Sequence, residues 1–113
     1  MKPRSAKKKG KRLQNKISAL ILEKFDTLEP DDVRSITMGD RGEEILLSPA
    51  ARKQFPFSVE CKNQEKLNIW SAIEQAENNS GNHTPLVIFK RNRTKTYAVL
   101  EFDNLLELLN ESE

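Results

Sequence analysis

Two apolar segments limit the possible folds more than any other feature of this sequence. Residues 56–62 (PFSVECK) have the composition of a strand, and residues 85–90 (PLVIFK) form a continuous apolar run, as expected of a strand buried on both faces. Residues 64–79 lie between them and carry apolar side chains at helical spacing, namely Ile69, Ala72, Ile73 and Ala76. The sequence therefore predicts a strand, a helix capped by Asn63 and a second strand, which together make a crossover unit with parallel strands.

The other elements follow from periodicity and turn residues. We predict a helix at 13–28, strands at 32–37, 43–47 and 96–102, and a C-terminal helix at 104–110 capped by Asp103. The turn RNRTK before the strand at 96–102 favours a hairpin with 85–90. The order α-β-β-β-α-β-β-α predicts an α/β fold, in which helices flank a mixed five-stranded sheet.

Basic residues are concentrated at the start of the chain. Residues 1–12 hold seven Lys and Arg side chains and no acid, and without those seven charges the formal net charge would fall from +2 to −5. We expect residues 1–12 to form a disordered basic arm on a single domain made of residues 13–113. Such an arm either improves solubility or contacts phosphates, and the second role makes candidates of Lys7, Lys8, Lys9, Lys11 and Arg12.

Composition excludes several kinds of site. The single cysteine, Cys61, cannot form an internal disulfide or a multi-cysteine zinc site, which favours an intracellular, cytoplasmic protein. No apolar run reaches the length of a membrane span, so no membrane partner is expected. The only histidine, His83, lies in a Gly/Asn loop, and the only tyrosine, Tyr97, lies among apolar strand residues. Neither placement suits a histidine general base or a tyrosine nucleophile.

A charged pair interrupts the strand at 56–62. Glu60 and Lys62 are two residues apart, so on a strand they share one face, while Val59 and Cys61 take the other. Charged residues on a strand that is buried need partners. Two interpretations remain open: a half-buried salt bridge between the two side chains, or a part of a catalytic site.

The catalytic interpretation needs a second carboxylate, which Glu44 can supply from the start of the strand at 43–47. Two carboxylates that converge from adjacent strands make an oxygen-ligand site suited to Mg²⁺. Lys62 beside such a site can orient or activate a water molecule and offset charge on a phosphate. This combination suits hydrolysis of a phosphodiester, and Gln75 on the polar stripe of the helix at 64–79 is expected to face the same site.

Four blocks of the chain, in order, resemble the PD-(D/E)xK nuclease superfamily, and they look similar to small phage-type endonucleases that are like Holliday-junction resolvases. The blocks are DDVRSITMG, GEEILLSPAARKQFPFSVECK, LNIWSAIEQAE and KRNRTKTYAVL. The resemblance implies a restriction-endonuclease-like core. It also implies that Glu60 and Lys62 are the (D/E)xK pair, that Glu44 and Glu60 bind the metal, and that Gln75 belongs to the catalytic set. The family pattern has Asp where this chain has Glu44, so the first metal ligand could instead be Asp40 or Glu43.

The resemblance implies a Mg²⁺-dependent DNA endonuclease, with Mn²⁺ able to substitute and no small-molecule cofactor. It favours a homodimer that resolves branched DNA, because symmetric cutting of a four-way junction needs two active sites. Five basic residues and one amide are candidates for contacts with the DNA backbone: Arg34, Arg52, Lys90, Arg91 and Arg93, with Asn92. The alternatives are a homing or nicking endonuclease of the same fold, or a non-catalytic DNA-binding module with a degenerate site. A phage-encoded protein of this kind would act in the host cytoplasm.

Overall fold

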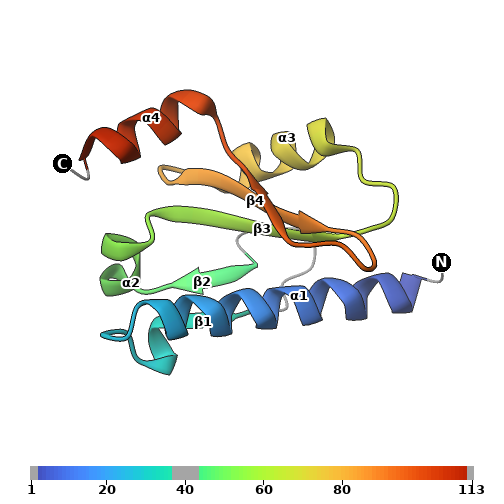
Figure 1. The fold of residues 1–113 in the computed structure, drawn as a ribbon, viewed down its shortest axis with the longest axis horizontal. Coiled ribbons are helices and arrows are strands. Elements are labelled where there is room, and N and C mark those ends of the chain that lie inside the picture. The colour runs from blue at the N-terminus through green and yellow to red at the C-terminus, as the bar shows by residue number, and fades with distance from the viewer. Residues whose placement is uncertain (1–2, 37–43, 112–113) are drawn as a thin grey trace.

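The computed structural model describes residues 3–36 and 44–111 (Figure 1). In chain order the elements are α1 (Pro3–Lys24), the 3-10 turn η1 (Pro30–Asp32), β1 (Val33–Ser35), β2 (Ile45–Leu47), α2 (Pro49–Gln54), β3 (Phe57–Asn63), α3 (Ile69–Asn79), β4 (Thr84–Lys90), β5 (Tyr97–Val99) and α4 (Phe102–Glu111). They form a mixed α/β arrangement, in which β1–β2 and β3–β4–β5 make two sheets.

Strands β3 and β4 are the parallel pair that the crossover unit predicts. Their register runs from Phe57 opposite Thr84 to Asn63 opposite Lys90, and α3 connects them along the chain. Strand β5 pairs antiparallel with β4, which confirms the predicted hairpin. Because β3 and β4 run in the same direction, their carboxyl ends lie side by side at Asn63 and Lys90.

The structure contains a two-stranded and a three-stranded sheet in place of the single five-stranded sheet that we predicted. Strands β1 and β2 pair antiparallel, and β2 lies beside β3. At that edge of β3, however, the backbone N–H of Cys61 donates to the carboxylate of Glu44 at 2.9 Å. A side chain thus takes a hydrogen bond that a strand carbonyl would accept in a continuous sheet, and this substitution separates the two sheets.

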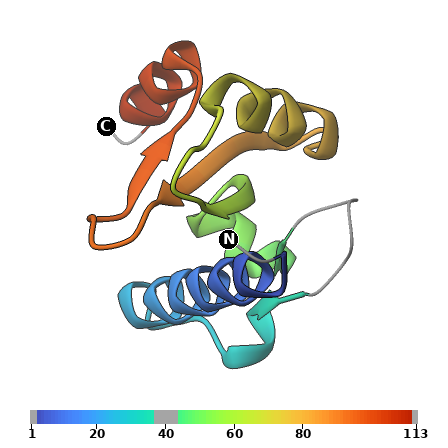
Figure 2. The same cartoon turned by 90° about the vertical axis from the view of Figure 1, so that its right-hand side faces the viewer.

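The two faces of the β3–β4 pair pack against different helices (Figure 2). Val59 of β3 is buried with Leu13 and Ile17 of α1 on one face. On the other face, Val87 of β4 is buried with Ala76 of α3. Complete burial of a valine side chain contributes about 1.5–3 kcal/mol, so both faces stabilise the arrangement. The alternation of side chains along β3 therefore decides which residues point toward α1 and which toward α3.

Helix α1 begins earlier than the predicted helix at 13–28, and residues 3–12 are helical where we expected a disordered arm. Two properties explain why the helix extends into residues 3–12. Elongation of an existing helix fixes fewer dihedral angles per hydrogen bond than nucleation does, and Lys, Arg and Ala are good helix formers. Lys11 Nζ also donates to Ser35 Oγ at 3.2 Å, which joins this half of the helix to β1. At its other end α1 stops at Lys24, although Leu28 still reaches the core.

Helix α3 begins at Ile69, whereas the sequence predicted a start at residue 64. Its N-cap is Asn68, whose side chain accepts the backbone N–H of Ser71 at 3.1 Å. Asn63, the predicted cap, instead ends β3. Asn63 cannot both pair with β4 and cap a helix. The seven residue pairs between β3 and β4 stabilise the strand more than one capping hydrogen bond would stabilise the helix.

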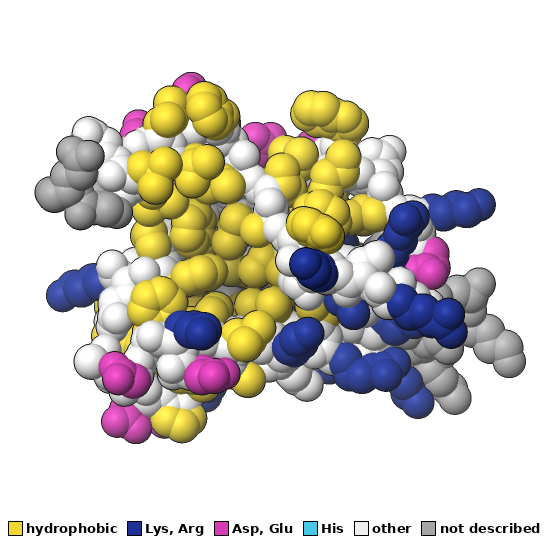
Figure 3. Space-filling model, viewed as in Figure 1, with side chains coloured by type: hydrophobic (Ala, Val, Ile, Leu, Met, Phe, Trp, Pro, Cys, Tyr) yellow, Lys and Arg dark blue, Asp and Glu magenta, His cyan; other side chains and the backbone are white. Residues whose placement is uncertain are grey.

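Helix α4 starts at Phe102, so Asp103 lies in its first turn and does not precede it as the predicted cap. No residue of α4 is buried, and the helix packs against the main core through the partly buried Leu108. Figure 3 shows apolar side chains gathered on this part of the surface; the exposed ones on α4 are Phe102, Leu105, Leu106 and Leu109. Within residues 3–36 and 44–111, the helices are too short or too polar to cross a membrane.

Candidate active site

The charged pair of β3 lies on the face that α3 covers. Glu60 is opposite Val87 and Lys62 is opposite Phe89, and both of these β4 side chains pack in the cluster with α3. Lys62 Nζ lies 4.0 Å from Glu60 Oε2. This distance is long compared with the 2.7–2.9 Å or so of a charge-assisted hydrogen bond. The pair is therefore formed, as the salt-bridge interpretation predicted, but the lysine does not satisfy the carboxylate.

The two oxygens of Glu60 have different surroundings. Oε1 accepts a hydrogen bond from Asn79 Nδ2 at 3.0 Å. Oε2 is buried and has no hydrogen-bond partner among the described residues, and Glu60 as a whole is 2% exposed. An unsatisfied buried polar atom costs about 1–3 kcal/mol, and more when it is charged. Such a cost is expected where a site needs a free acceptor for a ligand.

Glu44 approaches the same place from the residue before β2. Its Oε2 accepts the N–H of Cys61, the residue between Glu60 and Lys62. Burial raises the pKa of the Glu44 carboxyl, the Cys61 N–H opposes that rise, and the nearby charge of Glu60 adds to it. Lys62 lowers the pKa by a smaller amount. The charge of Glu60 is therefore near enough to act on the Glu44 carboxyl, and the shared metal site stays a prediction.

The thiol between the two charged residues of β3 takes no part in this chemistry. Cys61 is buried in the cluster with α1, on the opposite face from Glu60. Burial raises the pKa of the Cys61 thiol, and the charges of Glu44 and Glu60 raise it further. A protonated, buried thiol is neither a nucleophile nor a metal ligand. The contribution of Cys61 to the site is its backbone N–H.

The donor atoms suit a hard divalent cation. Glu44 and Glu60 offer carboxylate oxygens, and Oε2 of Glu60, which accepts no hydrogen bond from the described residues, is an acceptor that a cation would satisfy. Burial is the main cause of the raised pKa of Glu44, and a cation between the two carboxylates would offset both that burial and the smaller effect of the Glu60 charge. Residues 3–36 and 44–111 contain no group of three or more His, Cys, Asp or Glu side chains placed to hold a metal. Mg²⁺ commonly binds through one or two carboxylates and completes its shell with water and substrate oxygens.

Asp40 and Glu43, the alternative first ligands, lie outside the described residues. The choice between them and Glu44 therefore stays a prediction, although Glu44 already lies beside Glu60.

Helix α3 brings Asn79 to the carboxylate, a residue that the sequence analysis missed. Asn79 follows Gln75 by four positions, so both side chains project from the same side of the helix. Gln75 itself lines a shallow hollow with Ser71, Glu74 and Asn79. The predicted part of Gln75 in catalysis stays a prediction. A signal for Asn79 was present in the sequence, because the polar stripe of α3 continues to it.

Several predicted DNA-binding residues converge on one cleft between α1 and the carboxyl ends of β3 and β4. We name it the basic cleft; it is lined by Lys9, Arg12, Lys16, Asn63, Lys90, Asn92, Arg93 and Leu13. The sequence analysis missed Lys16 and Asn63, although Lys16 follows Arg12 by one helical turn. Lys8 is exposed beside this group on α1, and the side chain of Lys7 lies outside the described part.

The remaining basic candidates are elsewhere. Arg34 is exposed on β1, and Lys11 bonds Ser35 on the same strand. Arg52 Nη1 donates to the carbonyl of Phe57 at 3.2 Å, which holds the start of β3. A role in DNA binding stays a prediction for each of them.

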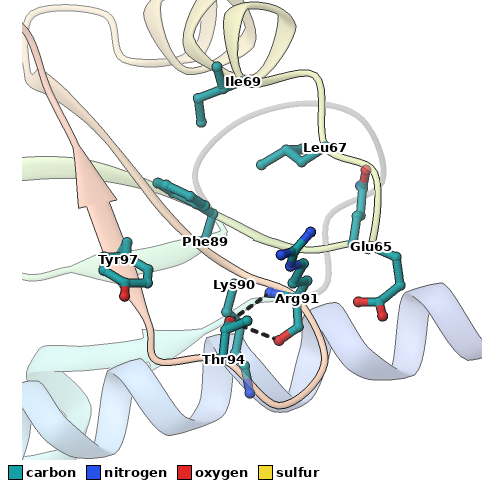
Figure 4. Close-up of a pocket in the computed structure, with 9 residues that line it drawn as sticks. Glu65, Leu67, Ile69, Phe89, Lys90, Arg91, Thr94 and Tyr97 are labelled. Atoms are coloured by element: carbon teal, nitrogen blue, oxygen red, sulfur yellow. Dashed lines mark hydrogen bonds between the residues drawn. The ribbon is translucent and has the colours of Figure 1, made fainter.

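Arg91 lies on the other side of the hairpin, in a pocket of about 390 Å³ (Figure 4). Leu67, Ile69, Phe89 and Tyr97 make much of its wall, and Glu65 adds a negative charge. Thr94 Oγ1 accepts the N–H of Arg91 and donates to its carbonyl, which fixes the turn. Lys90 also lines this pocket, so the pocket combines an apolar wall with charges of both signs.

Comparison with known proteins identifies a family for this chain. A family model described as "Phage putative PDDEXK endonuclease" matches residues 5–113. No curated protein and no solved structure matches the chain. The family match spans the elements that carry Glu44, Glu60 and Lys62, and it agrees with the resemblance found in the four sequence blocks. The chain belongs to the phage PDDEXK endonuclease family.

Proposed function

We propose that this protein is a Mg²⁺-dependent DNA endonuclease whose active site contains Glu44, Glu60 and Lys62. One observation carries the proposal: the buried carboxylate of Glu60 keeps Oε2 without a hydrogen-bond partner among the described residues, next to a second carboxylate. Lys62 Nζ lies 4.0 Å from that oxygen, which is too far for a hydrogen bond, so Oε2 remains an acceptor that a metal would satisfy.

Each residue has a distinct part in the reaction. Glu44 and Glu60 would hold Mg²⁺, which when bound stabilises the charge that develops on the attacked phosphate and lowers the pKa of a bound water. Asn79 fixes the other oxygen of Glu60, and the Cys61 N–H fixes Glu44, so both carboxylates are oriented before substrate binds. Lys62 lies on the same face and can donate a hydrogen bond to the attacking water or to a phosphate oxygen. The water attacks phosphorus in line and loses a proton to solvent, the bond to the leaving oxygen breaks, and that oxygen takes up a proton from solvent.

The proposed substrate is branched DNA, including four-way junctions, and the proposed assembly is a homodimer. This part of the proposal rests on the resemblance to resolvase-like proteins. Two symmetric cuts in one junction need two active sites related by a two-fold axis. Sedimentation of the protein alone and with a four-way junction tests the assembly, because a monomer on the junction would contradict it.

A nuclease assay tests the activity and separates the alternatives. Labelled single-stranded, duplex, flap and four-way-junction DNA are incubated with the protein in Mg²⁺, in Mn²⁺ and in EDTA. Preferential cutting of the junction supports the proposal. Cutting of one defined duplex site with no preference for junctions identifies a homing or nicking endonuclease instead.

The rival outside the enzymes is a DNA-binding module with a degenerate site. Calorimetric titration with Mg²⁺ distinguishes it, since such a module should show no binding that depends on Glu44 and Glu60. Glu60→Gln is compared there with Glu107→Gln, which removes an exposed acid from α4. Equal Mg²⁺ binding by wild type and Glu60→Gln would favour the rival.

A further inference from the structure

The basic cleft gathers positive charge from two distant parts of the chain. Among the described residues, five basic side chains line it and no acidic one does: Lys9, Arg12, Lys16, Lys90 and Arg93. Its volume is about 250 Å³. In Figure 3 the Lys and Arg side chains crowd this side of the molecule, where the hairpin tip lies over the N-terminal half of α1 (Figure 1).

The fold, more than the sequence neighbourhood, brings these groups together. Lys9, Arg12 and Lys16 recur at intervals of three and four residues, so they form one stripe along α1. Lys90 ends β4 opposite Asn63, because the two parallel strands finish at the same edge. The cleft therefore exists only if the N-terminal half of α1 is helical and packed, which is the arrangement that the structure shows.

The hairpin tip is held in a fixed conformation. Asn92 N donates to Glu65 Oε2 at 2.7 Å, and Thr94 bonds both backbone groups of Arg91. Arg93 has a φ of 63°, which places it in the left-handed region. A tip held in this way presents its cations at a fixed place and loses little conformational freedom when it binds a ligand.

Like charges in one cleft repel each other, and a bound anion relieves that repulsion. With the five cations of the cleft set aside, the formal net charge of the chain falls from +2 to −3, so this cleft is where a polyanion can approach. Asn63 adds a buried amide oxygen that has no partner among the described residues. A water molecule that bridges it to a phosphate would supply the missing donor.

The cleft lies at the carboxyl end of β3, the strand that carries Glu60 and Lys62. Three residue steps separate Glu60 from Asn63, which is about 10 Å on a strand, and Asn63 points to the α1 face whereas Glu60 points to the α3 face. One DNA strand advances about 3.4 Å along the helix axis per nucleotide. We infer that the basic cleft binds a backbone phosphate of the DNA substrate, a few nucleotides away from the phosphate that is cut. This inference rests on the proposed function and adds to it the element that places the DNA strand.

The test compares two double variants with the same change of charge. Lys16→Ala with Arg93→Asn removes two cations of the cleft, and Asn tolerates the left-handed backbone at position 93. The control, Lys24→Ala with Lys95→Asn, removes exposed cations from the same two elements outside the cleft. Binding to a labelled four-way junction is measured by fluorescence anisotropy in EDTA, at several salt concentrations.

The cleft variant should bind more weakly, and its slope of log K against log salt should fall by about 1, since one phosphate contact is lost. The control should keep the slope of the wild type. Circular dichroism verifies that both variants are folded, and Lys9→Ala with Arg12→Ala provides a second cleft variant. Equal slopes for the cleft variants and the control would overturn the inference.

A neutral methylphosphonate in the DNA locates the contact. Placed a few nucleotides from the cut, it should weaken binding by the wild type and have little further effect on the cleft variant. Additive effects would show that the cleft does not contact that phosphate. Binding in EDTA is independent of cleavage, so the two proposals fail separately. If the wild type does not cut DNA but the cleft variant has a smaller slope of log K against log salt, only the proposed nuclease activity is rejected. If the wild type cuts DNA and the slopes are equal, only the proposed role of the cleft is rejected.

Discussion

The carboxylate of Glu44 accepts the backbone N–H of Cys61 at 2.9 Å. Cys61 directly follows Glu60, so this hydrogen bond holds Glu44 next to the second acid of the site. The same bond occupies the edge of β3 that faces β2, and β2 and β3 belong to separate sheets. A strand carbonyl in this position would have continued the sheet but left no second carboxylate at the site. The break in the sheet and the pair of acids therefore have one cause.

Glu60→Gln and Lys62→Ala should each reduce cleavage of DNA about a thousandfold or more, because a metal ligand or the group that positions water contributes several kcal/mol to the transition state. Single-turnover rates in Mg²⁺ measure the effect. Binding of DNA in EDTA and the circular dichroism spectrum should remain close to those of the wild type. Glu107→Gln and Lys95→Ala, which change exposed residues of the same types, are the controls. Wild-type rates in either site variant would exclude the assignment.

Glu44→Gln should be as severe as Glu60→Gln, since both carboxylates are proposed to hold the metal. Gln keeps the acceptor for the Cys61 N–H, so the fold should persist while the charge is lost. Mg²⁺ titrations and cleavage rates measure the loss. If Asp40→Asn or Glu43→Gln proves severe and Glu44→Gln mild, the first ligand lies in the segment outside the described residues.

Asn79→Ala should lower the affinity for Mg²⁺ about 10–100-fold, because Asn79 orients Glu60 without touching the metal. Saturating Mg²⁺ should restore most of the rate, which a merely destabilised protein would not show. Asn79→Ser, which retains a donor, should recover part of the affinity. The comparison with Gln75→Ala decides which of the two residues the site uses, and a larger effect at Gln75 would support the assignment that the resemblance implied.

The stability of the metal-free protein should depend on pH through Glu44. Burial raises the pKa of Glu44 in the folded protein above its usual value of 4.5. The stabilisation by its protonated form is complete below that value and is lost as the pH rises through the folded pKa. Glu44→Gln is neutral throughout, so the wild type should lose thermal stability relative to this variant as the pH increases. Calorimetric scans of both proteins in EDTA measure the difference in Tm, and a difference that stays constant with pH would contradict the prediction.

Sequence periodicity predicted the parts of the fold that depend on local pattern. The apolar run at 85–90 gave β4, and the alternation along 56–62 gave β3 and placed Glu60 and Lys62 on one face. The hairpin followed from turn residues at 91–95, and the parallel pair followed from the helix between the strands. These features need only residues that are near each other in the chain.

What the sequence could not supply depends on distant contacts. The hydrogen bond from the Cys61 N–H to the Glu44 carboxylate joins two segments that are separate in the sequence, so the periodicity of either segment does not predict it. Likewise, nothing local to Arg12 or Arg93 shows that both line one cleft. The run of Lys and Arg before residue 13 is compatible with a disordered arm and with a helix, and contacts such as Lys11 with Ser35 favour the helix.

Deletion of residues 1–12 tests that helix. A disordered arm buries no core, so its removal would leave the thermal transition unchanged. In the structure, deletion removes the hydrogen bond from Lys11 to Ser35 and leaves Leu13, which is 2% exposed, at a frayed helix end. Loss of one hydrogen bond costs about 0.5–1.5 kcal/mol, so we expect Tm to fall by several degrees.

The same deletion should also flatten the salt dependence of DNA binding, because Lys9 and Arg12 leave the basic cleft. Cleavage at saturating DNA should change little, since no residue of 1–12 belongs to the proposed metal site. Thermal scans and binding titrations of the full and shortened chains measure both effects. A lower Tm together with a smaller salt dependence of DNA binding would indicate a packed helix that contacts phosphate. A smaller salt dependence with an unchanged Tm would support the disordered arm that the sequence predicted. An unchanged slope would leave the contacts with DNA to the residues beyond position 12, and the cleft would then depend on Lys16, Lys90 and Arg93.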